Sequence, residues 1–128
     1  MIQAELVANL HAAGVEELYI SNDVDGTDPR WVAATGTMVQ GGMTPQFVSS
    51  TIAVLGEAFR VVGADVTELA PPLKWHIPGE PARSNQMAAH YAVKQIEALL
   101  GERGRFGDAV PIPEPATEEQ VWNLPPYA

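Results

Sequence analysis

The stretch Y-I-S-N-D-V-D-G-T-D-P, residues 19–29, places three aspartates directly after an apolar segment. Residues 17–22 are typical of a short buried strand, and Asp23, Asp25 and Asp28 follow it within six positions. Carboxylates at the end of a buried strand are costly unless a cation or hydrogen bonds compensate them. The stretch therefore indicates a divalent-metal site, a phosphate-handling site or a plain acidic turn.

Two of these aspartates are spaced for a shared site. Side chains two residues apart on a strand point the same way, so Asp23 and Asp25 are predicted to project from one face. They lie at the carboxyl end of the strand, which is where ligands bind in open α/β sheets. Two neighbouring carboxylates repel unless a cation or a shared proton relieves them, and hard divalent ions prefer such oxygen donors.

The rest of the chain alternates helices and strands. Apolar spacing, caps and stop signals predict helices at 2–13, 44–59 and 84–100, strands at 17–22 and 60–66, and a long loop at 26–42. This order predicts an α/β fold built on an open parallel sheet with helices on its faces. The last helix is expected to bury an apolar face made of Met87, Ala88, Tyr91, Ile96, Leu99 and Leu100.

The chain divides into an α/β unit at 1–100 and a proline-rich arm at 101–128. Within the arm, Thr117 and Gln120 have the spacing of a capping box ahead of one helical turn. Three aromatic residues of the arm, Phe106, Trp122 and Tyr127, are expected to anchor it.

Composition excludes several classes of partner and site. The sequence has 16 acidic and 7 basic residues, a net charge of -9, which argues against a nucleic-acid partner. It has no cysteine, so disulfides and thiolate metal sites are excluded. No apolar run has the roughly 20 residues of a membrane helix, and the first residues do not resemble a signal peptide. A soluble cytoplasmic protein without a membrane partner is expected.

Three interpretations of the aspartates remain. A calcium loop starting at Asp23 would need glycine at its sixth position and glutamate at its twelfth, where this chain has Asp28 and Ala34. D-V-D-G-T after a strand resembles the first motif of the haloacid dehalogenase superfamily, which implies a Mg-dependent phosphatase. The only later strand, however, offers Asp65 and Glu68 without the adjacent acidic pair such enzymes use.

A third resemblance covers residues from about 5 to 100. The segments S-N-D-V-D-G-T-D-P, A-T-G-T at 34–37, G-G-M-T-P at 41–45 and G-A-D-V-T-E-L-A-P-P at 63–72 occur in that order. Together they resemble the C-terminal part of the ureohydrolase family, which includes arginase and agmatinase, and E-L-A-P-P is more similar to the agmatinase branch. The resemblance implies a three-layer parallel-sheet fold of which only the C-terminal βαβα portion is present.

The same resemblance implies an activity and a role for each site residue. Family members hydrolyse guanidino compounds with two Mn²⁺ ions bridged by a hydroxide. By similarity, Asp23 would bridge both ions, Asp25 would bind one, and Asp28 would hydrogen-bond a ligand or fix the turn. Glu68 would bind a small cationic guanidino substrate such as agmatine, and Thr37 would line the same pocket. Urea would be released.

The resemblance is incomplete. The chain has Asn22, Met38 and Phe47 where family members usually have an apolar residue, proline and an acidic residue. It lacks the upstream G-G-D-H and D-A-H-x-D segments that supply the other metal ligands. The expected partner is therefore an N-terminal ureohydrolase half or a second copy in a homo-oligomer. The competing interpretation is a non-catalytic binding module that keeps this half-fold.

Overall fold

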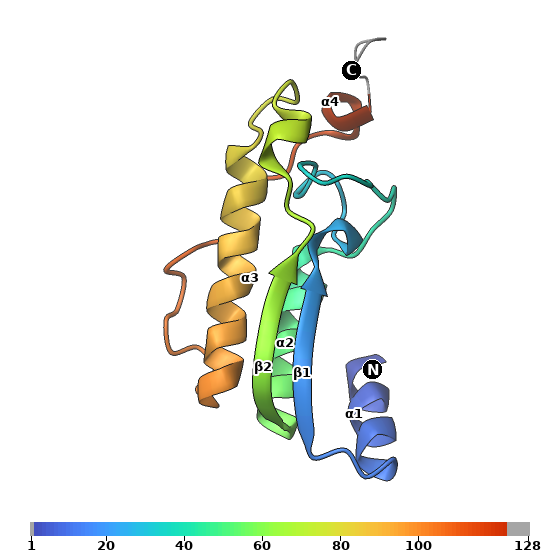
Figure 1. Ribbon diagram of the computed structural model, residues 1–128, viewed down its shortest axis with the longest axis vertical. Helices are drawn as coiled ribbons and strands as arrows, with labels where there is room; N and C mark the ends of the chain where they lie inside the picture. Colours follow the sequence, from blue (N-terminus) through green and yellow to red (C-terminus); the bar gives the residue numbers. More distant parts are fainter. Residues whose placement is uncertain (1, 123–128) are drawn as a thin grey trace.

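The computed structural model describes residues 2–122 as a pair of parallel strands with helices packed beside them (Figure 1). The elements in chain order are α1 Ile2–Ala12, β1 Glu17–Asp23, η1 Val24–Gly26, α2 Pro45–Ala58, β2 Arg60–Thr67, η2 Pro71–Lys74, α3 Ala82–Leu100 and α4 Glu118–Trp122. The predicted order and the α/β class are confirmed. No helix in this part of the chain has the length and apolar character needed to cross a membrane.

The two strands bring their carboxyl ends together. They pair in parallel from Glu17 opposite Arg60 to Asp23 opposite Thr67, with one irregularity after Leu18. Both arrows in Figure 1 point to the same end of the molecule, where the loops after β1 and β2 meet. Any site made by residues following the two strands must therefore form at this end.

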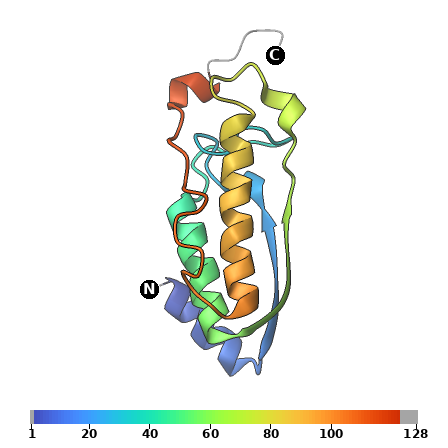
Figure 2. The same ribbon diagram turned by 90° about the vertical axis from the view of Figure 1, so that its left-hand side faces the viewer.

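Helices cover one face of the sheet. In Figure 2 the helices α1, α2 and α3 all lie to one side of or in front of the strands, and no helix lies beyond the opposite face. On the strands themselves, Tyr19 is 60% exposed and Val62 is 53% exposed. The residues that the structure describes thus contain two layers of the predicted three-layer arrangement.

The long helices begin and end for local reasons. Thr44 caps α2 by accepting a hydrogen bond from the Phe47 N–H at 3.2 Å, and Pro45 occupies the first turn, where it costs no hydrogen bond. Gly101 ends α3 with a left-handed φ of 68°, which glycine adopts without strain. The helix begins at Ala82, two residues earlier than predicted.

The core forms between β1, β2, α2 and α3. Its buried apolar side chains are Val24, Trp31, Val32, Val48, Ile52, Val61, Met87, Tyr91 and Ala98. The predicted apolar face of the last helix is only partly correct, because Ile96, Leu99 and Leu100 are 41–54% exposed. Polar residues of α3 are buried in their place, and hydrogen bonds make this possible: Gln95 accepts from the Asn22 amide at 3.0 Å and donates to the Asp65 carbonyl at 2.9 Å.

Backbone contacts hold the arm more than aromatic rings do. The capping box is confirmed, since Gln120 N–H donates to Thr117 Oγ1 and Thr117 N–H donates to Gln120 Oε1. The anchor prediction is wrong for Phe106 and Trp122, which are 42% and 38% exposed, and Tyr127 lies outside the described residues. The buried contacts of the arm are instead Val121 and Ala116, and the Ala116 N–H donates to the Arg30 carbonyl at 2.7 Å.

A buried histidine connects α3 to α2 and to the arm. His90 Nε2 lies 2.8 Å from Ser49 Oγ, and Nδ1 lies 2.7 Å from the Val110 carbonyl oxygen. Burial lowers the pKa of His90 and outweighs the Val110 carbonyl, which raises it. The imidazole therefore stays neutral in the folded protein at a pH where it would take up a proton in the unfolded chain.

Stability is expected to fall in mild acid because of this histidine. Of the charged groups around it, Lys94 opposes protonation, whereas Asp108 and Glu97 favour it. Because the unfolded state binds the proton more readily, the free energy of unfolding should drop by up to about 1 kcal/mol between about pH 7 and about pH 5.5. Urea denaturation at both pH values measures this. His90→Gln should remove most of the change in unfolding free energy between the two pH values, whereas His11→Gln, at an exposed histidine, should leave that change intact. An unaltered pH dependence in His90→Gln would contradict the attribution of the effect to His90.

Candidate functional site

The carboxyl end of β1 carries two aspartates joined by a tight turn. Asp23 is the last residue of the strand, and its carboxylate accepts a hydrogen bond from the Asp25 N–H at 3.2 Å. This contact caps the 3-10 turn Val24–Gly26. The predicted strand alternation therefore does not extend to Asp25. The turn itself brings the two carboxylates together, with Val24 buried beneath them.

The acidic groups of this turn influence one another. Partial burial raises the pKa of Asp25, and so do a hydrogen bond with Asp23 and the negative charges of Asp23 and Glu68. The negative charge of Glu68, directly after β2, thus adds to that of Asp23 in disfavouring the charged form of Asp25. Neighbouring carboxylates repel one another unless a cation or a shared proton relieves them.

Glu68 has an unusual backbone conformation. It follows β2 directly and is exposed, with φ at 70°, the only positive φ among the described residues other than glycine. A non-glycine residue in the left-handed region costs about 1 kcal/mol or more, and such residues concentrate at functional sites. The strain turns the chain sharply where it leaves the sheet, one residue beyond the level at which Asp23 lies opposite Thr67.

Asp28 has a structural position. Its side chain is 4% exposed, and its Oδ1 accepts from the Arg30 N–H at 3.0 Å and from Arg30 Nε at 3.1 Å. Its own N–H donates to the Met43 carbonyl at 2.8 Å. This close approach requires Gly42, because a β-carbon there would lie 2.8 Å from Asp28 N. Through these bonds Asp28 connects the turn to Arg30 and to Met43.

The loop that contains Thr37 is tied to α3 and to the segment after β2 through Ala34. The Ala34 N–H donates to Ser84 Oγ at 3.0 Å, and the Ala34 carbonyl accepts from the Ala70 N–H at 2.7 Å. Ala70 lies two residues after Glu68, and exposed Thr37 lies three residues after Ala34. The bond between Ala34 and Ala70 places the two chain segments that lead to Thr37 and from Glu68 beside each other at these residues.

A buried ion pair supports this loop, and the sequence prediction did not include it. Glu80 has a buried side chain; its Oε1 lies 3.3 Å from Arg83 Nη1 and its Oε2 accepts from the Ser84 N–H at 3.3 Å. Burial raises the pKa of Glu80, while Ser84 and Arg83 oppose the rise. Glu80 and Arg83 have opposite charges three positions apart, but Glu80 lies before α3, so spacing on a helix does not predict this pair.

The described residues contain no complete metal site. Asp23 and Asp25 are oxygen donors of the kind that Mn²⁺ and Mg²⁺ prefer, so the donor chemistry fits such an ion. Within residues 2–122, however, no group of three or more histidine, cysteine, aspartate or glutamate side chains is arranged to hold one. A complete coordination shell of about six ligands needs further donors.

Known proteins match this chain over most of its length. The Arginase family matches residues 2–100. The arginase of Saccharomyces cerevisiae is 38% identical over 89 residues, which cover 70% of this chain and 25% of that protein. The agmatinase of Bacillus cereus is 38% identical over 55 residues, which cover 42% of this chain and 19% of that protein.

Solved structures match the fold in the same partial way. The arginase of Bacillus caldovelox superposes with a TM-score of 0.61 and 27% identity, covering 80% of this chain and 31% of that chain. The matched regions therefore span about a fifth to a third of the length of these relatives. The matched part includes both strands and the aspartates that follow β1.

Proposed function

This chain belongs to the arginase family, and from that premise we propose that it carries part of the active site of a Mn²⁺-dependent amidinohydrolase that releases urea from a linear guanidino compound. The observation that supports this most directly is the turn that joins Asp23 and Asp25 at the carboxyl end of β1, next to the end of β2 that Glu68 follows. We take the substrate to be a small cationic guanidino compound, because the relatives are named arginase and agmatinase.

Asp23 and Asp25 are proposed as metal ligands. The 3-10 turn keeps Asp23 and Asp25 next to each other. The two carboxylates therefore repel each other when no cation is bound. A bound metal pair would relieve that repulsion and provide a water-derived nucleophile at neutral pH. Asp28 does not need to touch an ion; its contacts with Arg30 keep the turn rigid.

Glu68 is proposed to bind the guanidinium group. A carboxylate and a planar guanidinium form strong charge-assisted hydrogen bonds, often in pairs. In support, Glu68 has a left-handed backbone where the chain leaves β2, and the Ala34–Ala70 bond joins the loop that leads to Thr37 to the segment after Glu68. The negative charge of the trio also attracts a cationic substrate, in keeping with the acidic balance of the whole chain.

The remaining ligands are proposed to come from outside residues 1–128, either from an N-terminal ureohydrolase half or from a second copy. A specific observation also favours a second candidate function, a non-catalytic binding module: the described residues contain no group of three or more potential metal-binding side chains. The two candidates differ in one measurable property, the release of urea.

The test is a urea-release assay with Mn²⁺ on arginine, agmatine and 3-guanidinopropionate. The chain is assayed alone and in the complex in which it is isolated from its own cells. We expect the purified chain to be inactive alone and the complex to release urea from one of the three substrates. A complex that loads Mn²⁺ and leaves all three substrates intact would favour the binding module.

A further inference from the structure

The arm is bound to α3 by a row of polar side chains on that helix. Its members lie three or four positions apart, a spacing that places residues on one side of a helix: Arg83, Gln86, His90, Lys94 and Glu97. The last of them accepts a hydrogen bond from the Phe106 N–H at 2.9 Å. The other four meet carbonyl oxygens of the arm: Arg83 Nε that of Glu114 at 3.2 Å, Gln86 Nε2 that of Pro111 at 2.9 Å, His90 Nδ1 that of Val110 at 2.7 Å and Lys94 Nζ that of Gly107 at 3.2 Å.

These bonds recognise the backbone of the arm rather than its side chains. The segment V-P-I-P-E-P at 110–115 forms neither helix nor strand, and proline has no N–H, so this backbone offers mainly carbonyl acceptors. The row on α3 supplies the matching donors. Figure 2 shows the arm running along α3 from the end of that helix back toward the carboxyl ends of the strands. The arm therefore reaches the end of the molecule at which Asp23 lies.

At that end the arm contacts Arg30, which lies two residues after Asp28. The Ala116 N–H donates to the Arg30 carbonyl at 2.7 Å, and Ala116 is buried. Glu118 Oε1 lies 3.4 Å from Arg30 Nε, and the same nitrogen lies 3.1 Å from Asp28 Oδ1. The guanidinium also lies over the Trp31 ring, 4.8 Å from its centroid. The Arg30 side chain thus connects a carboxylate near the turn with a carboxylate of the arm.

Arg30 matters to the turn because Asp28 is buried. Burying a carboxylate is costly unless hydrogen bonds or a cation compensate it, and Arg30 provides both. Asp28 lies three residues after Asp25, and its N–H is bonded to the Met43 carbonyl. A displacement of Arg30 would therefore move Asp28 and, with it, the segment that carries Asp23 and Asp25.

We propose that Arg30 is a positioning residue for the turn that carries Asp23 and Asp25. The arm holds Arg30 in place through Ala116 and Glu118, so the metal affinity of the turn depends on whether the arm is bound. The arm lies outside residues 2–100, the part that matches the Arginase family. The inference rests on the proposed function, since it takes the two aspartates to be metal ligands.

Amide hydrogen exchange tests the inference without requiring activity, on the protein as it is isolated from its own cells. Arg30→Met keeps the length of the side chain and removes its charge and its donors. We expect the Thr27 and Asp28 N–H groups to exchange about tenfold faster, because the loss of a hydrogen bond to a charged group favours local opening. Arg105→Met is the control, at an exposed arginine that pairs with Glu102, and should leave both rates unchanged.

Metal affinity separates positioning from a general loss of stability. In Arg30→Met the dissociation constant of Mn²⁺ should rise about 10–100-fold, the usual effect of removing a residue that supports a ligand. KM for the guanidino substrate at saturating Mn²⁺ should stay unchanged. Arg30→Lys keeps the charge and should recover part of the affinity. A purely structural residue would lower the thermal midpoint and leave the Mn²⁺ dissociation constant as it is in the wild type.

A matched pair of substitutions tests the contribution of the arm. Glu118→Gln removes the charge that faces Arg30, whereas Glu119→Gln removes the same charge from the neighbouring exposed position. Glu118→Gln should weaken Mn²⁺ binding by up to about fivefold, the size expected for a partly exposed ion pair, and Glu119→Gln should have no effect. The double variant Arg30→Met/Glu118→Gln should bind Mn²⁺ no more weakly than Arg30→Met, because Glu118 acts through Arg30.

The outcomes distinguish this inference from the proposed function. Unchanged exchange at Thr27 and Asp28 in Arg30→Met would overturn the inference whether or not the protein releases urea. Unaltered Mn²⁺ affinity in Arg30→Met, or additive effects of Arg30→Met and Glu118→Gln, would overturn it and leave the hydrolase intact. A wild-type protein that binds no Mn²⁺ would refute the hydrolase, and faster exchange in Arg30→Met would then still sustain the hold of Arg30 on the turn.

Discussion

Replacing Asp23 with asparagine is expected to abolish urea release by the complex while leaving this chain folded. Loss of a residue that only supports a metal ligand typically costs 10–100-fold in affinity or activity, so loss of a direct ligand should cost more than about 100-fold. Asparagine keeps an oxygen that can accept the hydrogen bond from the Asp25 N–H, so the 3-10 turn should persist. Urea release and Mn²⁺ content of the purified complex measure the effect.

The matched control is Asp108→Asn. It removes the same charge from the exposed arm, far along the chain from both strand ends, and should leave activity and metal content unchanged. Equal thermal midpoints for the two variants would show that the difference lies at the site. Wild-type activity in Asp23→Asn would remove this residue from the proposed ligand set.

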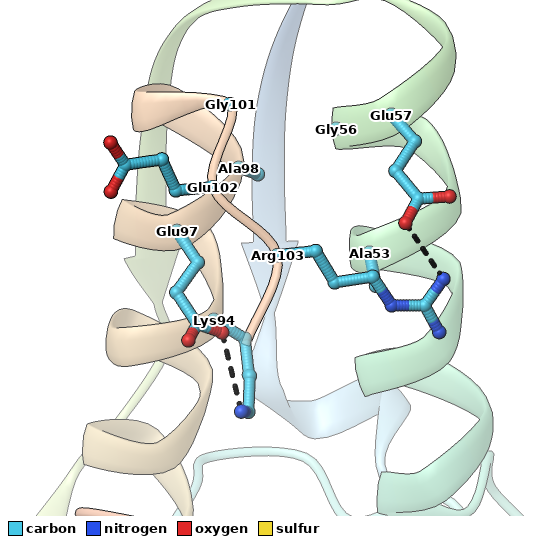
Figure 3. Close-up of a pocket in the computed structure, with 9 residues that line it drawn as sticks. All are labelled: Ala53, Gly56, Glu57, Lys94, Glu97, Ala98, Gly101, Glu102 and Arg103. Carbon is cyan, nitrogen blue, oxygen red and sulfur yellow. Dashed lines mark hydrogen bonds and ion pairs between the residues drawn. The ribbon is translucent and has the colours of Figure 1, made fainter. Parts of the chain in front are cut away.

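Adding a single methyl group at Gly56 is expected to be the most damaging small change to the fold. Gly56 lies on α2 where the helix touches α3, and a β-carbon there would lie 2.8 Å from Ala98 Cβ and 2.9 Å from Ala98 Cα. Figure 3 shows Gly56 on α2 opposite Ala98 on α3, among the residues that line a pocket, with the Glu57–Arg103 and Lys94–Glu97 ion pairs drawn as dashed lines. Gly56→Ala must therefore push the helices apart.

The expected cost of Gly56→Ala is about 2 kcal/mol in the free energy of unfolding, since overpacking typically costs 1–3 kcal/mol and outweighs the better helix propensity of alanine. Thermal and urea unfolding measure it. Gly36→Ala is the control, because a β-carbon there meets no atom within 4 Å. The double variant Gly56→Ala/Ala98→Gly should recover part of the loss. A neutral Gly56→Ala would show that α2 and α3 are not in close contact.

The fold was predictable where local signals agree with the final structure. Thr44-Pro45 marks the start of α2, and Gly101 marks the end of α3, because a hydroxyl cap and a left-handed glycine act within a few residues. The aspartates stood out for a related reason: three carboxylates after an apolar strand are conspicuous in any sequence. The resemblance to one family then supplied the expected roles of Glu68 and Thr37, which remain proposals.

The remaining features depend on distant contacts. No local pattern predicts that Glu68 adopts a left-handed φ or that Ser84 holds Ala34 from fifty residues away. The exposure of Ile96 and Leu99 was not predicted, because an exposed apolar residue on a helix can have the same spacing as a residue that is buried in a core. The spacing of apolar residues indicates which side chains avoid water, whereas the packing of distant elements determines what covers those side chains.

The crossover between the two strands also has a consequence for synthesis. Glu17 at the start of β1 pairs with Arg60 at the start of β2. During translation β1 therefore leaves the ribosome well before β2, its hydrogen-bonding partner, has been synthesised. Parallel pairing between strands that are distant in sequence forms slowly, and strands whose edges are unpaired are prone to aggregate. The interval between translation of β1 and translation of β2 is therefore when this polypeptide most needs a molecular chaperone.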